Sequence, residues 1–215
     1  MIPSALIGYG ILRLVAAASG LLNCFARRFH REANSAVRRQ TVLPDGFLNG
    51  QHLPPLAALP YGAYTVGWSG CEAIALYNAL LALGRPRSLD AVASALERRG
   101  LLLNGLGGAN LTAVRRYLRR NGVCVRLLRR AAEFDAALGA ADCAILAYWT
   151  GRTLRRPGGG FSTIHTVMVQ PIPGGVMLCN ADCGSPRART AEGITAFLRS
   201  ADGTAICLLA LGKSD

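Results

Sequence analysis

Cys71 is the residue of this chain whose position is best suited to chemistry. It follows Gly70 and opens an apolar stretch that is predicted to be a helix up to Gly84. The first turn of a helix has backbone N–H groups without partners and carries the positive end of the helix dipole. Both features favour the thiolate, which is the nucleophilic form of cysteine. The sequence therefore makes Cys71 a candidate nucleophile.

A cysteine nucleophile needs a base within hydrogen-bond reach and a third group that holds the base. The chain has three histidines: His30 in a basic N-terminal segment, His52 in a proline-flanked loop, and His165 at the start of an apolar strand. A glycine hairpin after that strand is predicted to bring Asn180 and Asp182 back near His165. An amide oxygen or a carboxylate there can accept the imidazole N–H and fix the tautomer. His165 is therefore the candidate base, with Asn180 or Asp182 as its partner.

The elements that must position these residues change type along the chain. Helical patterns with capping residues dominate the first part, and short apolar runs separated by turns dominate the second. Helices followed by an antiparallel meander indicate an α+β fold. The predicted helices span about 71–83, 88–99, 111–120, 131–139 and 190–199, and the predicted strands span 123–128, 143–149, 164–170, 176–180 and 205–211.

Two motifs of the chain resemble a known family. A Gly-Cys pair opens a helix that contains Tyr-Asn-Ala-Leu and ends in Leu-Gly, and a His-x-Val-x-Val strand is followed by a hairpin to Asn or Asp. Together they resemble the papain-like cysteine peptidases, most of all the bacterial C39-type branch, which includes the leader-removing domains of bacteriocin exporters. The order of elements over about 61–211 fits this family, and these two motifs match it in residue detail.

The resemblance implies a papain-like α+β fold in which the helix that carries the cysteine packs on an antiparallel sheet. It implies a hydrolase, in the first place a peptidase that acts on a peptide or protein substrate through a thioester acyl-enzyme. Cys71 would be the nucleophile, His165 the general base and acid, and Asn180 the residue that orients the imidazole, with Asp182 in reserve. No cofactor is implied.

Two positions depart from the family pattern. The family carries a glutamine about six residues before the cysteine, whose amide donates to the oxyanion, whereas this chain has Thr65 there and Gln51 far upstream. Loss of one oxyanion donor can cost about 100–1,000-fold in rate. Glu72 replaces the glycine that commonly follows the cysteine, and its carboxylate opposes a neighbouring thiolate. A non-catalytic binding module of the same fold is therefore the alternative, and a transferase or deamidase would use the same residues.

The charge of the chain favours acidic partners without identifying one. The 215 residues carry a formal net charge of +12, and Lys213 is the single lysine among the basic residues. The arginines are scattered in pairs, and no zinc-finger spacing, RNA-binding aromatic motif or basic zipper accompanies them. The sequence therefore predicts no specific nucleic-acid binding, and an acidic lipid or protein surface fits the charge as well.

Seven cysteines favour a reducing compartment. Their number is odd, no Cys-x-x-Cys occurs, and Cys124, Cys143, Cys179 and Cys207 lie in apolar runs where cysteine behaves as a small buried hydrophobe. Cys179 and Cys183 are close in sequence, but no histidine lies near them. The sequence therefore predicts no metal site.

Residues 2–26 form an almost wholly apolar run. Its length fits a membrane span, but Arg13 at its centre costs about 2.5–3.5 kcal/mol on insertion scales. A helix packed on the domain or on a partner is the first interpretation, a membrane-associated helix the second, and a cleaved signal the third. The predicted division is an N-terminal helix and a loop-like linker over 1–60, then one domain over 61–215, in the cytoplasm. The oligomeric state is left open.

Overall fold

A six-stranded antiparallel sheet forms the centre of the computed structural model, which describes residues 26–151 and 163–213. The strand order is β3–β8–β4–β5–β6–β7, so the last strand of the chain lies between the first two of this sheet. A separate hairpin pairs β1 (Pro60–Tyr61) with β2 (Tyr64–Thr65). The strands of the main sheet are β3 (Val123–Leu128), β4 (Cys143–Trp149), β5 (Ile164–Ile172), β6 (Gly175–Cys179), β7 (Arg189–Ala191) and β8 (Thr204–Lys213).

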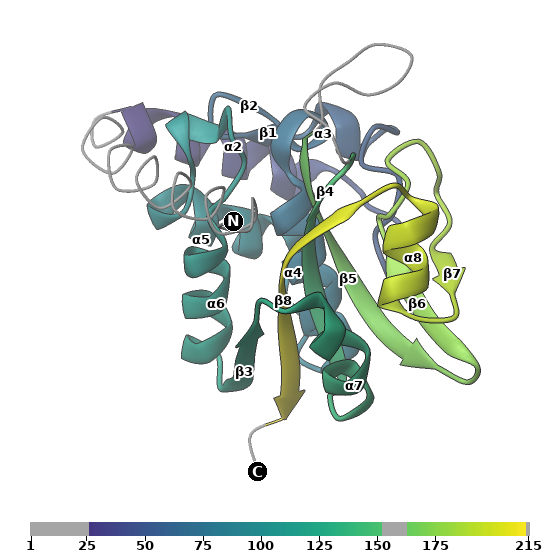
Figure 1. Cartoon of the computed structure of the whole chain (residues 1–215). Coiled ribbons are helices and arrows are strands. Elements are labelled where there is room, and N and C mark those ends of the chain that lie inside the picture. Colours follow the sequence, from purple (N-terminus) through teal and green to yellow (C-terminus); the bar gives the residue numbers. More distant parts are fainter. Residues whose placement is uncertain (1–25, 152–162, 214–215) are drawn as a thin grey trace.

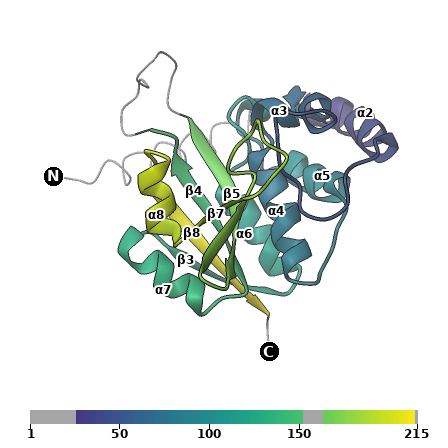
Figure 2. The ribbon, with the colours of Figure 1, turned by 90° about the vertical axis from the view of Figure 1, so that its right-hand side faces the viewer.

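Helices cover both faces of this sheet, as Figures 1 and 2 show. One layer contains α4 and the helices around it, and the other contains α7 and α8. The helices are α2 (Ala26–Gln40), α3 (Val66–Ser69), α4 (Cys71–Ala82), α5 (Leu89–Arg99), α6 (Leu111–Arg120), α7 (Phe134–Gly139) and α8 (Ile194–Ser200), with short 3-10 turns at Leu56–Ala58, Leu103–Gly105 and Ala131–Glu133.

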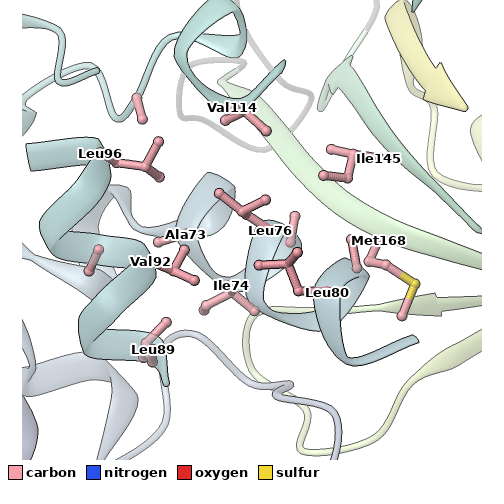
Figure 3. Packing of buried hydrophobic residues seen from close by; sticks show 14 of the residues in the cluster. Ala73, Ile74, Leu76, Leu80, Leu89, Val92, Leu96, Val114, Ile145 and Met168 are labelled. Carbon is pink, nitrogen blue, oxygen red and sulfur yellow. The ribbon is translucent and has the colours of Figure 1, made fainter. Parts of the chain in front are cut away.

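The core follows the period-two alternation of the central strand β4. Ile145 packs into the cluster that α4 and α5 form, whereas Ala144 and Leu146 pack against α7 and α8. Because both faces of the sheet are covered, nearly all of β4 is buried, which explains its continuous apolar sequence. Figure 3 shows the α4 side of this core, where Ile74, Leu76, Leu80, Val92, Leu96, Val114, Ile145 and Met168 meet.

The predicted α+β class is confirmed, and most elements lie where the sequence placed them. Strands β3 and β4 have the predicted bounds, and α4 ends one residue before its predicted end. The Asn110 side chain caps α6 by accepting from the Ala113 N–H at 3.1 Å, as an asparagine before a helix is expected to do. These elements are set by local patterns, and local patterns are what a sequence displays.

Three predictions about local structure are wrong. Residues 32–40, expected to be linker, are the second half of α2. Its inward face carries the polar residues Asn34 and Arg38, so no apolar stripe marks it as a helix. The segment 190–199 is not one helix: β7 pairs with β6 first, and α8 starts at Ile194. Cys124 is exposed rather than buried, because it falls on the uncovered positions of β3.

The division at residue 60 stays a prediction, although residues before it contribute to the core. Leu48, Leu56 and Leu59 are buried in the cluster that surrounds α4. Residues 1–25 lie outside the described range, so the expected N-terminal helix and its membrane association also stay predictions. Among the described residues, no helix has the length and apolar character needed to cross a membrane.

Candidate active site

Cys71 is the first residue of α4 and follows a kink that separates α3 from α4. Gly70 makes this kink possible, because a Cβ atom there would lie 2.7 Å from both Cα and Cγ1 of Val66. The first hydrogen bond of the new helix runs from the Ile74 N–H to the Gly70 carbonyl at 3.0 Å. Cys71 therefore lies in the first turn, with 6% of its surface exposed.

His165 is buried near the start of β5, opposite Tyr148 of β4. The ring of Tyr148 meets the imidazole edge-on, with the ring centres 5.9 Å apart. Nε2 of His165 lies 2.7 Å from the main-chain carbonyl oxygen of Asn180. A carbonyl oxygen can only accept, so Nε2 carries the proton in this arrangement and Nδ1 is the acceptor nitrogen of the neutral ring.

The thiol of Cys71 lies beside the strand residue that follows His165. The backbone N–H of Thr166 forms a hydrogen bond with Cys71 that lowers the pKa of its thiol. Burial acts in the other direction and is the largest influence, and the charge of Glu72 adds to it. The pKa of Cys71 is therefore raised well above its ordinary value, so the resting side chain is a thiol.

Asn180 contacts His165 through its main-chain carbonyl and not through its side chain. Its side chain is buried and pairs with Gln51: Nδ2 donates to Gln51 Oε1 at 3.1 Å, and Oδ1 accepts from the Gln51 N–H at 3.1 Å. Nε2 of Gln51 in turn donates to the carbonyls of Val66 and Gly67, at 2.9 and 3.2 Å. The two amides thus join the end of β6 to the segment that leads into Cys71.

We expect Asn180→Ala to lower the free energy of unfolding by about 2–4 kcal/mol. The change removes two buried hydrogen bonds and puts alanine at a φ of +62°, in the left-handed region. Asn180→Gly loses the same hydrogen bonds without that strain, so it should be about 1 kcal/mol more stable than the alanine variant. Urea denaturation of both variants measures this, and an alanine variant as stable as the unchanged chain would contradict it.

Asp182 and Thr65 have local roles in this structure. Asp182 is exposed, and its Oδ1 accepts from the Gly184 N–H at 3.0 Å within its own turn. Thr65 caps α3, because its Oγ1 accepts from the Trp68 N–H at 3.2 Å. The position where the family carries its oxyanion glutamine is therefore occupied by a helix cap.

Cys183 lies against His165, and the sequence interpretation missed it. Its Sγ is 3.8 Å from Nε2 of His165, and its side chain is partly exposed. The His52 N–H donates to the Cys183 carbonyl at 2.8 Å and fixes the turn. The signal was present, since Cys183 follows the same hairpin that returns Asn180 to His165. Within 26–151 and 163–213, no three His, Cys, Asp or Glu residues are grouped so as to hold a metal ion.

Two solved structures are similar to this chain. One is the peptidase domain of Streptococcus ComA, described as a bifunctional ABC transporter of a quorum-sensing pathway; it has 11% identity and a TM-score of 0.48, and the match covers 67% of this chain and 91% of that one. The other is a double glycine motif protease from an AMS/PCAT transporter, solved in complex with the leader peptide, with 13% identity, a TM-score of 0.42, and coverage of 67% and 84%.

Both structures are peptidase domains of the C39 type, the class that the two sequence motifs resemble. No protein-family model matches the sequence, and no curated protein gives a significant match. The similarity concerns the fold and carries no information about individual residues of the site.

Proposed function

We propose that this chain is a cysteine peptidase in which Cys71 is the nucleophile and His165 the general base and acid. One observation carries the proposal: the Thr166 N–H binds the Cys71 thiol, while the adjacent His165 has Nε2 engaged by a carbonyl oxygen. The engaged Nε2 leaves Nδ1 as the basic nitrogen. The main-chain carbonyl of Asn180, rather than its amide, takes the orienting role.

The reaction starts from a neutral thiol and a neutral imidazole. Nδ1 of His165 accepts the thiol proton as the sulfur of Cys71 attacks the substrate carbonyl. The C–N bond then breaks, the imidazolium gives its proton to the leaving amine, and a thioester remains on Cys71. Water, deprotonated by His165, hydrolyses the thioester and restores the thiol. The Cys71 backbone N–H, at the start of α4, is one donor for the oxyanion.

The surface beside Cys71 suits a peptide substrate. Trp68 lies three residues before the nucleophile, is 65% exposed and stacks on Tyr64, with ring centres 6.1 Å apart. Leu103 and Leu106 are also exposed, on the loop that packs against the β1–β2 hairpin through the Ala63 N–H and the Asn104 carbonyl. Exposed apolar side chains of this size can contact the side chains of a bound peptide.

A non-catalytic binding module is the second candidate, and the state of the thiol favours it. Cys71 is buried, and its thiol pKa is raised by burial and by the charge of Glu72. A nucleophile is ordinarily held in a site that lowers this pKa. Such a module would hold a peptide on the same surface without cleaving it.

Peptide cleavage decides between the two candidates. The purified chain is incubated at pH 5–8 with a peptide library made from a digested proteome, and new termini are found by mass spectrometry. We expect cleavage by the unchanged chain and by Cys124→Ala, a control at an exposed thiol, and none by Cys71→Ala. Absence of cleavage in the unchanged chain would support the binding module. Cleavage that survives in Cys71→Ala and disappears in Cys183→Ala would assign the nucleophile to Cys183.

A further inference from the structure

Glu72 places a carboxyl group in the interior directly beside the proposed nucleophile. Glu72 is only 5% exposed. Its carboxyl group is hydrogen-bonded to its own backbone N–H, to the Ala109 N–H and to the Cys71 thiol. Oε2 itself has no hydrogen-bond partner, and no basic side chain forms an ion pair with this carboxyl among the described residues. A buried carboxyl without a cation is costly to ionise.

The loop before α6 closes over this carboxyl group. Gly108 has a φ of +72°, and a Cβ atom there would lie 2.8 Å from Oε2 and 2.9 Å from Oε1 of Glu72. The bridge between Leu101 and Ala109 holds the loop in place. Only glycine leaves room for the carboxyl at this point, so the loop backbone covers Glu72.

The groups that face the pair of Cys71 and Glu72 come from several elements, and most of them disfavour a further negative charge on this pair. Tyr61 of β1 has a buried hydroxyl without a hydrogen-bond partner, and burial together with the charges of Glu72 and Glu97 raises its pKa. Cys183 acts on Cys71 in the same sense. The titratable groups that face Cys71 and Glu72 are therefore Tyr61 of β1, Cys183 after β6 and, in the proposed reaction, His165 of β5. Glu97 of α5 and Arg38 of α2 act on Tyr61, with opposite effects on its pKa.

The surroundings bring the ionisation of Glu72 into the neutral range. Burial raises its pKa from 4.5 to about 7, although the hydrogen bonds from Ala109 and Cys71 oppose this. Glu72 and Cys71 then titrate as a coupled pair. Because the pKa of Glu72 is about 7 while burial raises the pKa of the Cys71 thiol well above its ordinary value, the first proton lost by the pair comes mostly from the carboxyl.

We propose that Glu72 is a positioning residue that controls when Cys71 becomes a thiolate: its neutral acid permits the thiolate, and its carboxylate holds Cys71 as the thiol. The inference rests on the proposed function, since it concerns the nucleophile of that reaction. After the pair has lost one proton, it exists in two forms: a Glu72 carboxylate beside a Cys71 thiol, and a neutral Glu72 acid beside a Cys71 thiolate. The thiolate form is the minor one, and the ratio of the two forms does not change with pH. The minor form arises from the major form when the proton of the Cys71 thiol moves to the Glu72 carboxylate.

Alkylation of Cys71 tests this role directly. The chain is treated with iodoacetamide at pH 5.5–9.5, and the rate is followed by mass spectrometry on the peptide that contains Cys71. The exposed thiol of Cys124 is the internal reference. We expect the rate at Cys71 to rise up to about pH 7, to level off, and to rise again only at high pH. In Glu72→Gln the rate should rise without a plateau and be about tenfold or more higher at pH 8, since each unit of thiol pKa is tenfold in thiolate.

A control variant at another carboxylate and a second substitution of Glu72 complete the test. Glu133→Gln removes an exposed carboxylate and should reproduce the unchanged profile. Glu72→Ala should lose the plateau like Glu72→Gln, and circular dichroism checks that both variants are folded. A profile without a plateau in the unchanged chain overturns the proposal even if neither variant folds. A Glu72→Gln variant that labels no faster at pH 8 also overturns it.

This experiment does not depend on cleavage. A chain that shows the plateau but cleaves no peptide contradicts the peptidase and leaves the control of Cys71 by Glu72 intact. A chain that cleaves peptides while Cys71 labels identically with and without Glu72 contradicts only the present proposal.

Discussion

Replacing His165 by alanine is expected to slow peptide cleavage by about 100–10,000-fold, because the thiol of Cys71 then has no imidazole to take its proton. The effect should be large here because burial and Glu72 keep the resting cysteine protonated, so attack depends on a base. The loss should fall on kcat, since the imidazole acts on the reacting atoms rather than on substrate binding. Cleavage of a peptide from the library, measured with substrate in excess, gives both constants.

The control is His52→Ala, which changes an exposed side chain and keeps the main-chain N–H that holds Cys183. It should cleave at the unchanged rate. Added imidazole should restore part of the activity of His165→Ala, because a free base can enter the space left by the ring. A His165→Ala variant that retains more than a tenth of the activity would show that another group takes the proton. Glu72 is the group in hydrogen-bond contact with the thiol that would then be tested by substitution.

The placement of Cys71 could be predicted from sequence because it depends on neighbours in the chain. Gly70 allows the kink, and the apolar residues after Cys71 form the helix. The position of His165 at the start of β5 is likewise a local property. The location of a cysteine at the start of a helix and of a histidine at the start of a strand can therefore both be predicted from residue types and their order.

The partner of Asn180 could not be predicted in this way. Its amide binds Gln51, which is 129 residues earlier, and this leaves the main-chain carbonyl for His165. Main-chain contacts leave no trace in residue types. Glu72 is an intermediate case: its conflict with a thiolate was visible from sequence, but its burial under Gly108 depends on how a loop more than thirty residues later folds back.

The helix α2 went unrecognised for a related reason. A polar inward face is usually taken as a solvated one, and only the partners reveal that it is buried. Arg38 bonds to Asp90 and Glu97 of α5, and Asn34 bonds to Glu97 and to the Gly62 carbonyl. The contact between α2 and α5 is specific, but it cannot be predicted from a periodicity of apolar residues.

Arg38→Ala is expected to lower the free energy of unfolding by about 3–5 kcal/mol, since it leaves buried carboxylates without their cation. The Arg38 side chain is 1% exposed, and it donates to both oxygens of Glu97 at 2.9 Å and to Asp90 at 3.0 Å. Its Nη1 also donates to the Pro60 carbonyl at 2.8 Å. The loss should appear in urea denaturation at neutral pH.

The neighbouring Arg39 supplies the control. It is exposed at the end of the same helix, so Arg39→Ala removes an equal charge and should change stability by less than about 0.5 kcal/mol. If the two variants were equally stable, the hydrogen bonds between α2 and α5 would add nothing to stability beyond the long-range effect of one positive charge. If Arg38→Ala alone is destabilised, the residues before position 60 are part of the folding unit. Glu97 also accepts from the Gly62 N–H at 2.9 Å, so the network then helps to hold the hairpin that carries Tyr61 beside Glu72.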